Sequence, residues 1–384
     1  MTNKVYITEL SAFLPNDPVD NDAIEAVLGR IADLPSRTRK IVLKNNQIQR
    51  RHYAIDPESG RLTHTNAQLT AEAVRRLRPG RRFQPGDIEC LCCGTTSPDM
   101  FFPGHALMVM GELGLPPCEA ASAQGICLSG ITALKYAYLN VAAGASRNAV
   151  ATGSELASSF MRSGFFNSMA DPGEDLETRP IRAFDADFLR WMLSDGAGAM
   201  FLSNRPSEGR LSLEIEWIEH LSFAGELETC MYGGAVKRED GSMAGWRQFE
   251  AIPEHQRDYL FSVRQDIKLL DRHIVPTMGR ALTSAAARHG LMPSDVDWFL
   301  PHYSSGFFRQ KFYDGMKSVG FEVPYSKWFT NLTTRGNTGS AAIYIILSEL
   351  FESGRLAPGQ RLLCFVPESA RFSHAFMLLK VVQG

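Results

Sequence analysis

The sequence repeats one pattern: PGDIECLCCGTTS at residues 85–97 returns as PSDVDWFLPHYSS at residues 293–305. Each stretch begins with proline, a small residue and an aspartate, and runs into a short apolar segment that ends in small polar residues. Each also follows a stretch with helical periodicity, at 66–78 and at 278–290. Strands that alternate with helices are typical of α/β proteins, and the repeat half a chain apart predicts two similar halves.

The boundary between the halves is expected near residue 207. An apolar strand is predicted at 198–203 and an alternating strand at 211–219, with a turn of proline, serine and glycine between them. We therefore expect an N-terminal half over 1–207 and a C-terminal half over 208–384.

The composition is that of an ordinary globular protein, with 384 residues, 44% hydrophobic and 21% charged. A net charge of -2 gives no global field for nucleic acid or a membrane surface. The first fifteen residues lack the pattern of a signal peptide, and no apolar run approaches the eighteen or so residues of a spanning helix. We expect a cytoplasmic protein with no nucleic-acid or membrane partner. Since no dinucleotide fingerprint or phosphate-binding loop occurs, no cofactor is expected either.

The seven cysteines do not form a metal-binding pattern. Cys90, Cys92 and Cys93 lie in an apolar segment that reads as a buried strand, and no second pair of ligands follows at a suitable spacing. These three are predicted to be free core thiols in a reducing compartment, and no metal is expected.

Cys127 stands out because it precedes LSGITALKYAYLNVAAGA, an apolar stretch that ends in Gly144 and predicts a buried helix. Free backbone N–H groups and the helix dipole at this position would favour a nucleophilic thiolate. A core cysteine packed under a turn is the alternative reading of the same residues.

Two further residues could take part in chemistry with Cys127. His302 follows the apolar run 296–301 at the end of a predicted strand, where functional loops gather in α/β folds. Asn337 lies immediately before an apolar helix that begins near residue 341. A structural histidine and a helix-capping asparagine are the alternatives.

Together these sites resemble the ketoacyl-ACP synthase III family of the thiolase superfamily. GICLSGITAL resembles the nucleophile turn of that family, FLPHYSSGF its histidine segment, and RGNTGSAA its Gly-Asn-Thr-Ser segment. Three further segments match in order: TTSPDMFFPG at 95–104, ATGSELAS at 151–158 and SDGAGAMFL at 194–202. The resemblance implies a five-layered αβαβα fold built from two similar halves, usually a homodimer.

The resemblance also implies a reaction. Cys127 would carry an acyl group, and a malonyl- or β-ketoacyl-type thioester would lose carbon dioxide to give an enolate that attacks it. His302 and Asn337 would donate hydrogen bonds to the enolate oxygen. For acyl transfer, the backbone N–H of Cys127 would form half of an oxyanion hole.

Several positions depart from the family. The family usually has an asparagine three residues after the histidine, where this chain has Ser305. Its glycine-rich closing loop corresponds to FVPESARF at 365–372, where Pro367 has no N–H, so Ser369 is expected to complete the oxyanion hole. The changed closing loop, together with the absence at 41–48 of the tryptophan and arginine with which the family grips coenzyme A, resembles relatives in specialised metabolism, such as dialkylresorcinol and polyene producers.

The thioester donor is expected to be bound to an acyl carrier protein or to coenzyme A. The tryptophan and arginine with which the family grips coenzyme A are absent from residues 41–48, which favours a carrier protein. Four nearby cations could meet its acidic helix: Lys40, Lys44, Arg50 and Arg51.

The acyl chain is predicted to bind near Phe160, Phe165 and Phe166, in a glycine-interrupted segment rich in large apolar side chains. A subunit interface is the alternative for these residues.

Three other functions compete with condensation. They are an acyltransferase of the same fold that acts on oxygen or nitrogen, a cysteine hydrolase with the same Cys, His, Asn order, and a non-catalytic partner subunit.

Overall fold

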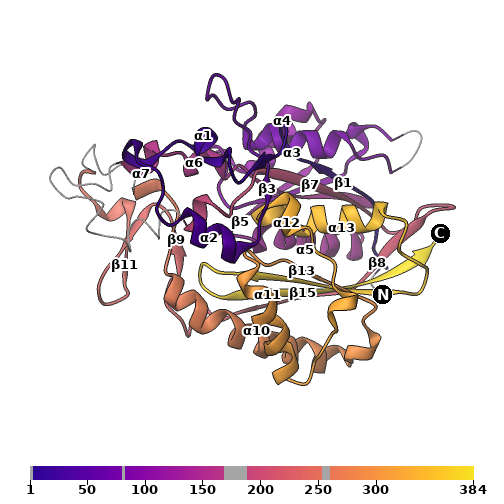
Figure 1. Ribbon diagram of the computed structural model, residues 1–384. Helices are drawn as coiled ribbons and strands as arrows, with labels where there is room; N and C mark the ends of the chain where they lie inside the picture. Colours follow the sequence, from indigo (N-terminus) through magenta and orange to yellow (C-terminus); the bar gives the residue numbers. More distant parts are fainter. Residues whose placement is uncertain (1–2, 80–82, 168–187, 253–259) are drawn as a thin grey trace.

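The computed structural model describes residues 3–79, 83–167, 188–252 and 260–384 (Figure 1). Among these residues one large mixed sheet contains β1 (Tyr6–Phe13), β4 (Cys90–Thr95), β5 (Glu119–Gln124), β6 (Asn148–Glu155), β7 (Gly196–Ser203), β8 (Leu211–Ser222), β13 (Trp298–Pro301), β14 (Arg361–Glu368) and β15 (Ser373–Gln383). The strand order is β13-β14-β15-β8-β1-β7-β6-β4-β5, so strands of the C-terminal half form one side and those of the N-terminal half the other. Two residue pairs of β1 and β8, Tyr6 with Glu214 and Ile7 with Leu213, join the two sides, and next to them the Ile215 N–H donates to the Val5 carbonyl at 2.9 Å.

The principal helices are α3 (Asn66–Arg75), α4 (His105–Leu113), α5 (Leu128–Ala142), α10 (Ile267–His289), α11 (Phe307–Ser318) and α13 (Ala342–Glu352). The shorter helices are α1 (Ile24–Leu28), α2 (Arg39–Asn46), α6 (Ser158–Met161), α7 (Gly164–Asn167) and α12 (Leu332–Arg335). The short strands are β2 (Val19–Asp20), β3 (Arg50–Arg51), β9 (Met231–Tyr232), β10 (Ala235–Lys237), β11 (Met243–Gly245) and β12 (Arg264–Gln265). No helix in these described ranges is both long enough and apolar enough to span a membrane.

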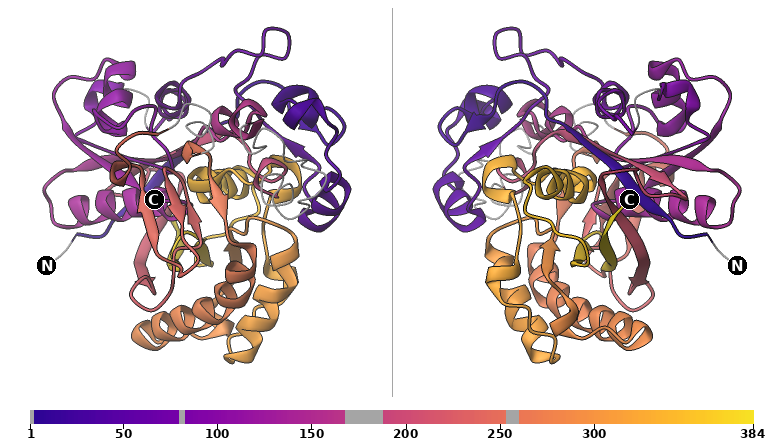
Figure 2. Two further views of the ribbon diagram at one scale, coloured as in Figure 1. Left: turned by 90° about the vertical axis from the view of Figure 1, so that its left-hand side faces the viewer. Right: turned by 90° about the vertical axis from the view of Figure 1, so that its right-hand side faces the viewer.

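The helices and strands stack in five layers. Helices α3 and α4 cover the outer face of the N-terminal strands, and α10 and α11 cover the outer face of the C-terminal strands (Figures 1 and 2). Helices α5 and α13 lie between the two groups of strands; α5 packs on β4 and β6 and also touches β14 and β15. The predicted α/β class and five-layered thiolase-like fold are confirmed.

The repeat seen in the sequence is also present in the local structure. In each half a helix leads through a 3₁₀ turn, Pro85–Asp87 or Pro293–Asp295, into a buried strand. The Asp87 carboxylate accepts the Gln84 N–H at 2.8 Å, and the Asp295 carboxylate accepts the Met292 N–H at 2.9 Å. The boundary predicted at residue 207 falls in the turn between β7 and β8, but the division into two domains stays a prediction.

The predicted burial of β4 is confirmed, whereas α5 is buried on one face only and exposes Tyr136 and Leu139 on the other. Cys90, Cys92 and Cys93 are fully buried free thiols in β4. Helix α5 begins directly after Cys127, and Gly144, which follows its end, has a φ of 75°. Left-handed backbone of this kind favours glycine, which explains the stop.

The two halves meet closely behind Cys127. A Cβ atom on Gly130 of α5 would lie only 2.2 Å from the Ser340 carbonyl oxygen, and one on Gly153 of β6 only 2.3 Å from it. The Tyr344 hydroxyl donates to the Gly130 carbonyl at 2.8 Å. Glycine at both positions therefore lets the segment after Asn337 pack directly on the elements that carry Cys127.

Candidate active site

Cys127 lies at the N-terminus of α5 and lines a cavity between the two halves. Its side chain is buried, with 7% of the residue surface exposed. Among the described residues its backbone N–H has no hydrogen-bond partner, as expected for the first amides of a helix. The position therefore combines a thiol with an N–H that is free to bind an oxyanion.

The environment of Cys127 opposes ionisation of the thiol. Burial raises its pKa well above the ordinary value, and the negative charges of Glu155 and Glu368 raise it further. The backbone N–H of Cys127 acts in the opposite direction but is outweighed. The helix terminus therefore acts in the predicted direction, but burial has the larger effect and favours the neutral thiol.

Asn337 lines the same cavity, and its backbone is fixed on both sides. Its N–H donates to the Met192 carbonyl at 3.0 Å, and its own carbonyl accepts the Ser194 N–H at 2.9 Å. The side-chain Oδ1 accepts the Gly339 N–H at 3.0 Å. This bond assigns the amide orientation and leaves the Nδ2 donors without a partner among the described residues.

His302 follows β13, as predicted, and its backbone N–H donates to the Phe365 carbonyl at 2.8 Å. Burial lowers the pKa of its imidazole to about 4, so the ring is neutral near pH 7 and carries one N–H. His302 does not itself line the cavity shared by Cys127 and Asn337, although Ser304, two residues later, does.

Ser369 lies in the turn between β14 and β15 and also lines the cavity. The Glu368 carboxylate accepts the N–H groups of Ala370 and Arg371 in this turn. The Ser369 N–H has no partner among the described residues. Among residues 369–371, the Ser369 amide is therefore the one that remains available to a ligand.

The apolar part of the cavity wall comes from both halves of the chain: Ile126, Ala157, Phe160, Leu189, Met192, Leu193, Met231 and Val263. Of the three predicted substrate-binding phenylalanines, only Phe160 belongs to this wall. Phe165 faces a separate surface hollow beside residues 26–29, and Phe166 is buried with its ring 5.6 Å from the Arg190 guanidinium carbon.

Glu155 and Thr96 also line the cavity, and the sequence did not single them out. Glu155 ends β6 and is 2% exposed. Its Oε2 accepts the Thr96 hydroxyl at 2.6 Å and the Ser340 N–H at 3.2 Å, whereas its buried Oε1 has no partner among the described residues. A glutamate at the end of an otherwise uncharged, buried strand was the signal that could have identified it.

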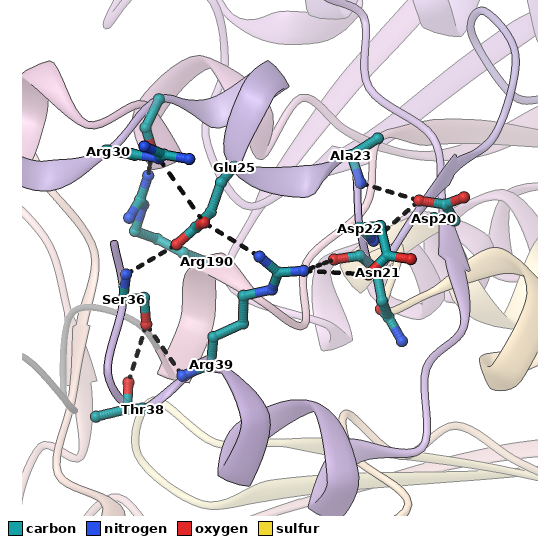
Figure 3. A network of polar contacts seen from close by, with 11 residues as sticks. Asp20, Asn21, Asp22, Ala23, Glu25, Arg30, Ser36, Thr38, Arg39 and Arg190 are labelled. Carbon is teal, nitrogen blue, oxygen red and sulfur yellow. Dashed lines mark hydrogen bonds and ion pairs between the residues drawn. The ribbon is translucent and has the colours of Figure 1, made fainter. Parts of the chain in front are cut away.

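The basic segment proposed to meet a carrier protein is only partly exposed. Figure 3 shows Arg39 held between the Glu25 carboxylate, at 3.1 Å, and the Asn21 carbonyl, at 2.6 Å. Arg51 is fully buried and donates to the Trp191 carbonyl, so its expected contact with a carrier is wrong. Three cations near this segment do remain exposed: Lys40, Lys44 and Arg50.

Comparisons with known proteins agree with this geometry. Residues 286–367 match the family described as 3-oxoacyl-[acyl-carrier-protein (ACP)] synthase III C terminal. The β-ketoacyl-[acyl-carrier-protein] synthase III of Hyphomonas neptunium is 24% identical over 363 residues, which cover 94% of this chain and 95% of that protein.

Solved structures share the fold over nearly the whole chain. The tetronic acid condensing enzyme AbyA1 superposes with a TM-score of 0.75 and 21% identity, covering 98% of this chain and 99% of its own. A variant of Xanthomonas campestris OleA gives a TM-score of 0.76 and 20% identity, covering 99% of both chains. The family match over residues 286–367, the relatives and the shared fold agree with the resemblance seen in the sequence: over most of its length this chain is similar to ketoacyl-ACP synthase III, and it shares the fold of the solved condensing enzymes.

Proposed function

We propose that this chain catalyses a decarboxylative Claisen condensation between an acyl group on Cys127 and a malonyl- or β-ketoacyl-type thioester, in fatty-acid or polyketide-type specialised metabolism. The observation that carries the proposal is the shared cavity. Cys127 and Asn337 both line it, and the Gly339 N–H donates to the Asn337 Oδ1, an orientation that leaves the Nδ2 hydrogens for a ligand.

In the first step the sulfur of Cys127 attacks the thioester carbonyl of the acyl donor. The tetrahedral intermediate carries negative charge on oxygen, and the backbone N–H groups of Cys127 and Ser369 are the two donors proposed to stabilise it. Collapse breaks the bond to the donor sulfur and leaves the acyl group on Cys127. The apolar wall, including Phe160, would hold the chain.

In the second step the extender thioester loses carbon dioxide and becomes an enolate. Its oxygen needs hydrogen-bond donors, which the neutral imidazole of His302 and the Asn337 amide can supply. The enolate carbon then attacks the acyl carbonyl, a carbon–carbon bond forms, and Cys127 is released. An acyltransferase that acts on oxygen or nitrogen would have no use for the Asn337 donor.

The partners are proposed to be an acyl carrier protein or acyl-coenzyme A, and a second copy of the chain. Support for a homodimer comes from strand β5, which ends the large sheet, and from Phe101 and Phe102, which are 69% and 77% exposed. Two adjacent residues with large exposed apolar side chains favour burial against a second protein surface. A cytoplasmic location is also proposed.

The test is intact mass of the protein after incubation with a panel of acyl thioesters, followed by addition of malonyl thioester. We expect an acyl adduct that maps to Cys127, and a β-keto product with loss of the adduct when extender is added. An adduct on another cysteine, or continued turnover by Cys127→Ala, would overturn the proposal. Transfer of the acyl group to an alcohol or amine without carbon dioxide release would favour the acyltransferase.

A further inference from the structure

The cavity contains one carboxyl group that the proposed reaction does not use. Glu155 lines it together with Cys127, and the charge of Glu155 is the largest electrostatic influence of another residue on the thiol. One oxygen of Glu155 is held by Thr96 and Ser340, while Oε1 is buried and unpartnered in the described part of the chain. A buried acceptor without a donor is costly unless another group supplies a proton.

We propose that Glu155 is the proton acceptor for Cys127 during acylation. The inference rests on the proposed function, because it assigns a path to the proton that the thiol must lose. The Cys127 S–H proton moves to Oε1 of Glu155 as the sulfur attacks the thioester carbonyl. When the tetrahedral intermediate collapses, the carbon–sulfur bond to the donor breaks and the departing thiolate takes the proton back from Glu155. The products are the Cys127 thioester and the free thiol of the donor, and no other reactant is needed.

The need for an acceptor follows from the state of Cys127. A thiol attacks as the thiolate, and burial keeps this thiol protonated. A neighbouring base solves the same problem for other weak nucleophiles, since it removes the proton only as the bond forms.

The other titratable groups near the site are less suited to this role. Glu368 also acts on Cys127, but both of its oxygens accept backbone N–H groups of its own turn. Asp195 acts on Glu155, but Ser158 and the Ala54 N–H occupy both of its oxygens. His302 lies outside the cavity wall.

The electrostatics of Glu155 fit reversible proton transfer. Burial raises its pKa to about 7, with a further increase from Asp195, while the Thr96 hydroxyl and the Ser340 N–H oppose the shift. A base with a pKa near the working pH can both take and return a proton. The carboxylate form predominates above a pH of about 7, so acylation is expected to slow as the pH falls below that value.

The experiment measures the rate of Cys127 acylation alone, by rapid quench and intact mass, from pH 5.5 to 8.5 without extender. The parent protein should show an inflection near pH 7, with the rate decreasing on the acid side. Glu155→Gln keeps an oxygen for Thr96 and the Ser340 N–H but cannot take a proton. Its acylation should be about 10²-fold slower or more, without that inflection.

Two further variants separate a proton acceptor from a structural residue. Thr96→Val removes a hydrogen bond that lowers the pKa of Glu155, so the inflection should move to higher pH. Glu368→Gln is the matched control, because it removes the other carboxylate near the thiol and should retain an inflection near pH 7.

If Glu155→Gln acylates at the parent rate with the same inflection, the inference is wrong. Should that variant fail to fold, an inflection in Thr96→Val identical to that of the parent would overturn it. A parent protein that never acquires an acyl group on Cys127 would instead refute the proposed function itself.

Discussion

Replacing Asn337 by aspartate should stop condensation and leave acylation of Cys127 largely intact. The structure makes this a clean substitution, because the Oδ1 that accepts the Gly339 N–H at 3.0 Å is present in both side chains. The change therefore removes the two Nδ2 donors and puts a second oxygen where the enolate would form. Loss of one oxyanion donor typically costs about 10²–10³ in rate, or about 2.7–4 kcal/mol. Repulsion between a carboxylate and the enolate adds to that cost.

The assay follows two rates on the same preparation: acyl loading of Cys127 by intact mass, and carbon dioxide release from a malonyl thioester. Loading should stay within a few-fold of the parent rate, while decarboxylation falls by at least 10²-fold. Because the site is buried, the pKa of the new carboxyl group should be raised. Below that pKa the group regains an O–H donor, so part of the activity should return as the pH falls. Decarboxylation near the parent rate at pH 8 would show that Asn337 is only a helix cap.

Three further outcomes are expected. Phe160→Ala should shift acyl preference towards longer chains in a thioester panel, because Phe160 lines the cavity. Phe166 is buried outside that wall, so Phe166→Ala should instead lower the free energy of unfolding by about 3–5 kcal/mol, measured by denaturant titration. Because burial lowers the pKa of His302 to about 4, condensation by a pre-acylated enzyme should not decline between pH 8 and 5.5, and a midpoint near 6.5 that His302→Gln abolishes would contradict this. The same acyl group should be used with higher kcat/KM on a carrier protein than on coenzyme A, and both salt and Arg50→Glu should reduce the difference; a salt-insensitive preference for coenzyme A would refute it.

The features predicted correctly from the sequence are those that local patterns determine. The repeated turn follows from an aspartate that caps its own turn, as Asp87 and Asp295 both do. The helix after Cys127 follows from an apolar run with a glycine at its end. Strand and helix ends then place Cys127 and Asn337 on the same side of the fold, since α5 and α13 both lie between the sheet halves and the Tyr344 hydroxyl of α13 donates to the Gly130 carbonyl of α5.

The features that were missed depend on residues distant in sequence. An arginine such as Arg51 is expected at the surface, and only the fold brings it to the Trp191 carbonyl, 140 residues away. The raised pKa of Cys127 likewise depends on the carboxylates of Glu155 and Glu368, which no spacing near Cys127 reveals. Helix position alone favoured the thiolate, but burial is the larger effect.

One turn links the two chemical steps. The Gly339 N–H donates to the Asn337 side chain, and the N–H of the next residue, Ser340, donates to the Glu155 carboxylate. A Cβ atom on residue 339 would lie 2.2 Å from the Glu155 Oε2, so only glycine fits there. Gly339 also has a φ of 52°, which side chains disfavour. The donor proposed for the enolate and the carboxyl group proposed for the Cys127 proton are therefore positioned by the same three residues. A shift of this turn would disturb acylation and condensation together, whereas loss of either functional group alone should affect a single step.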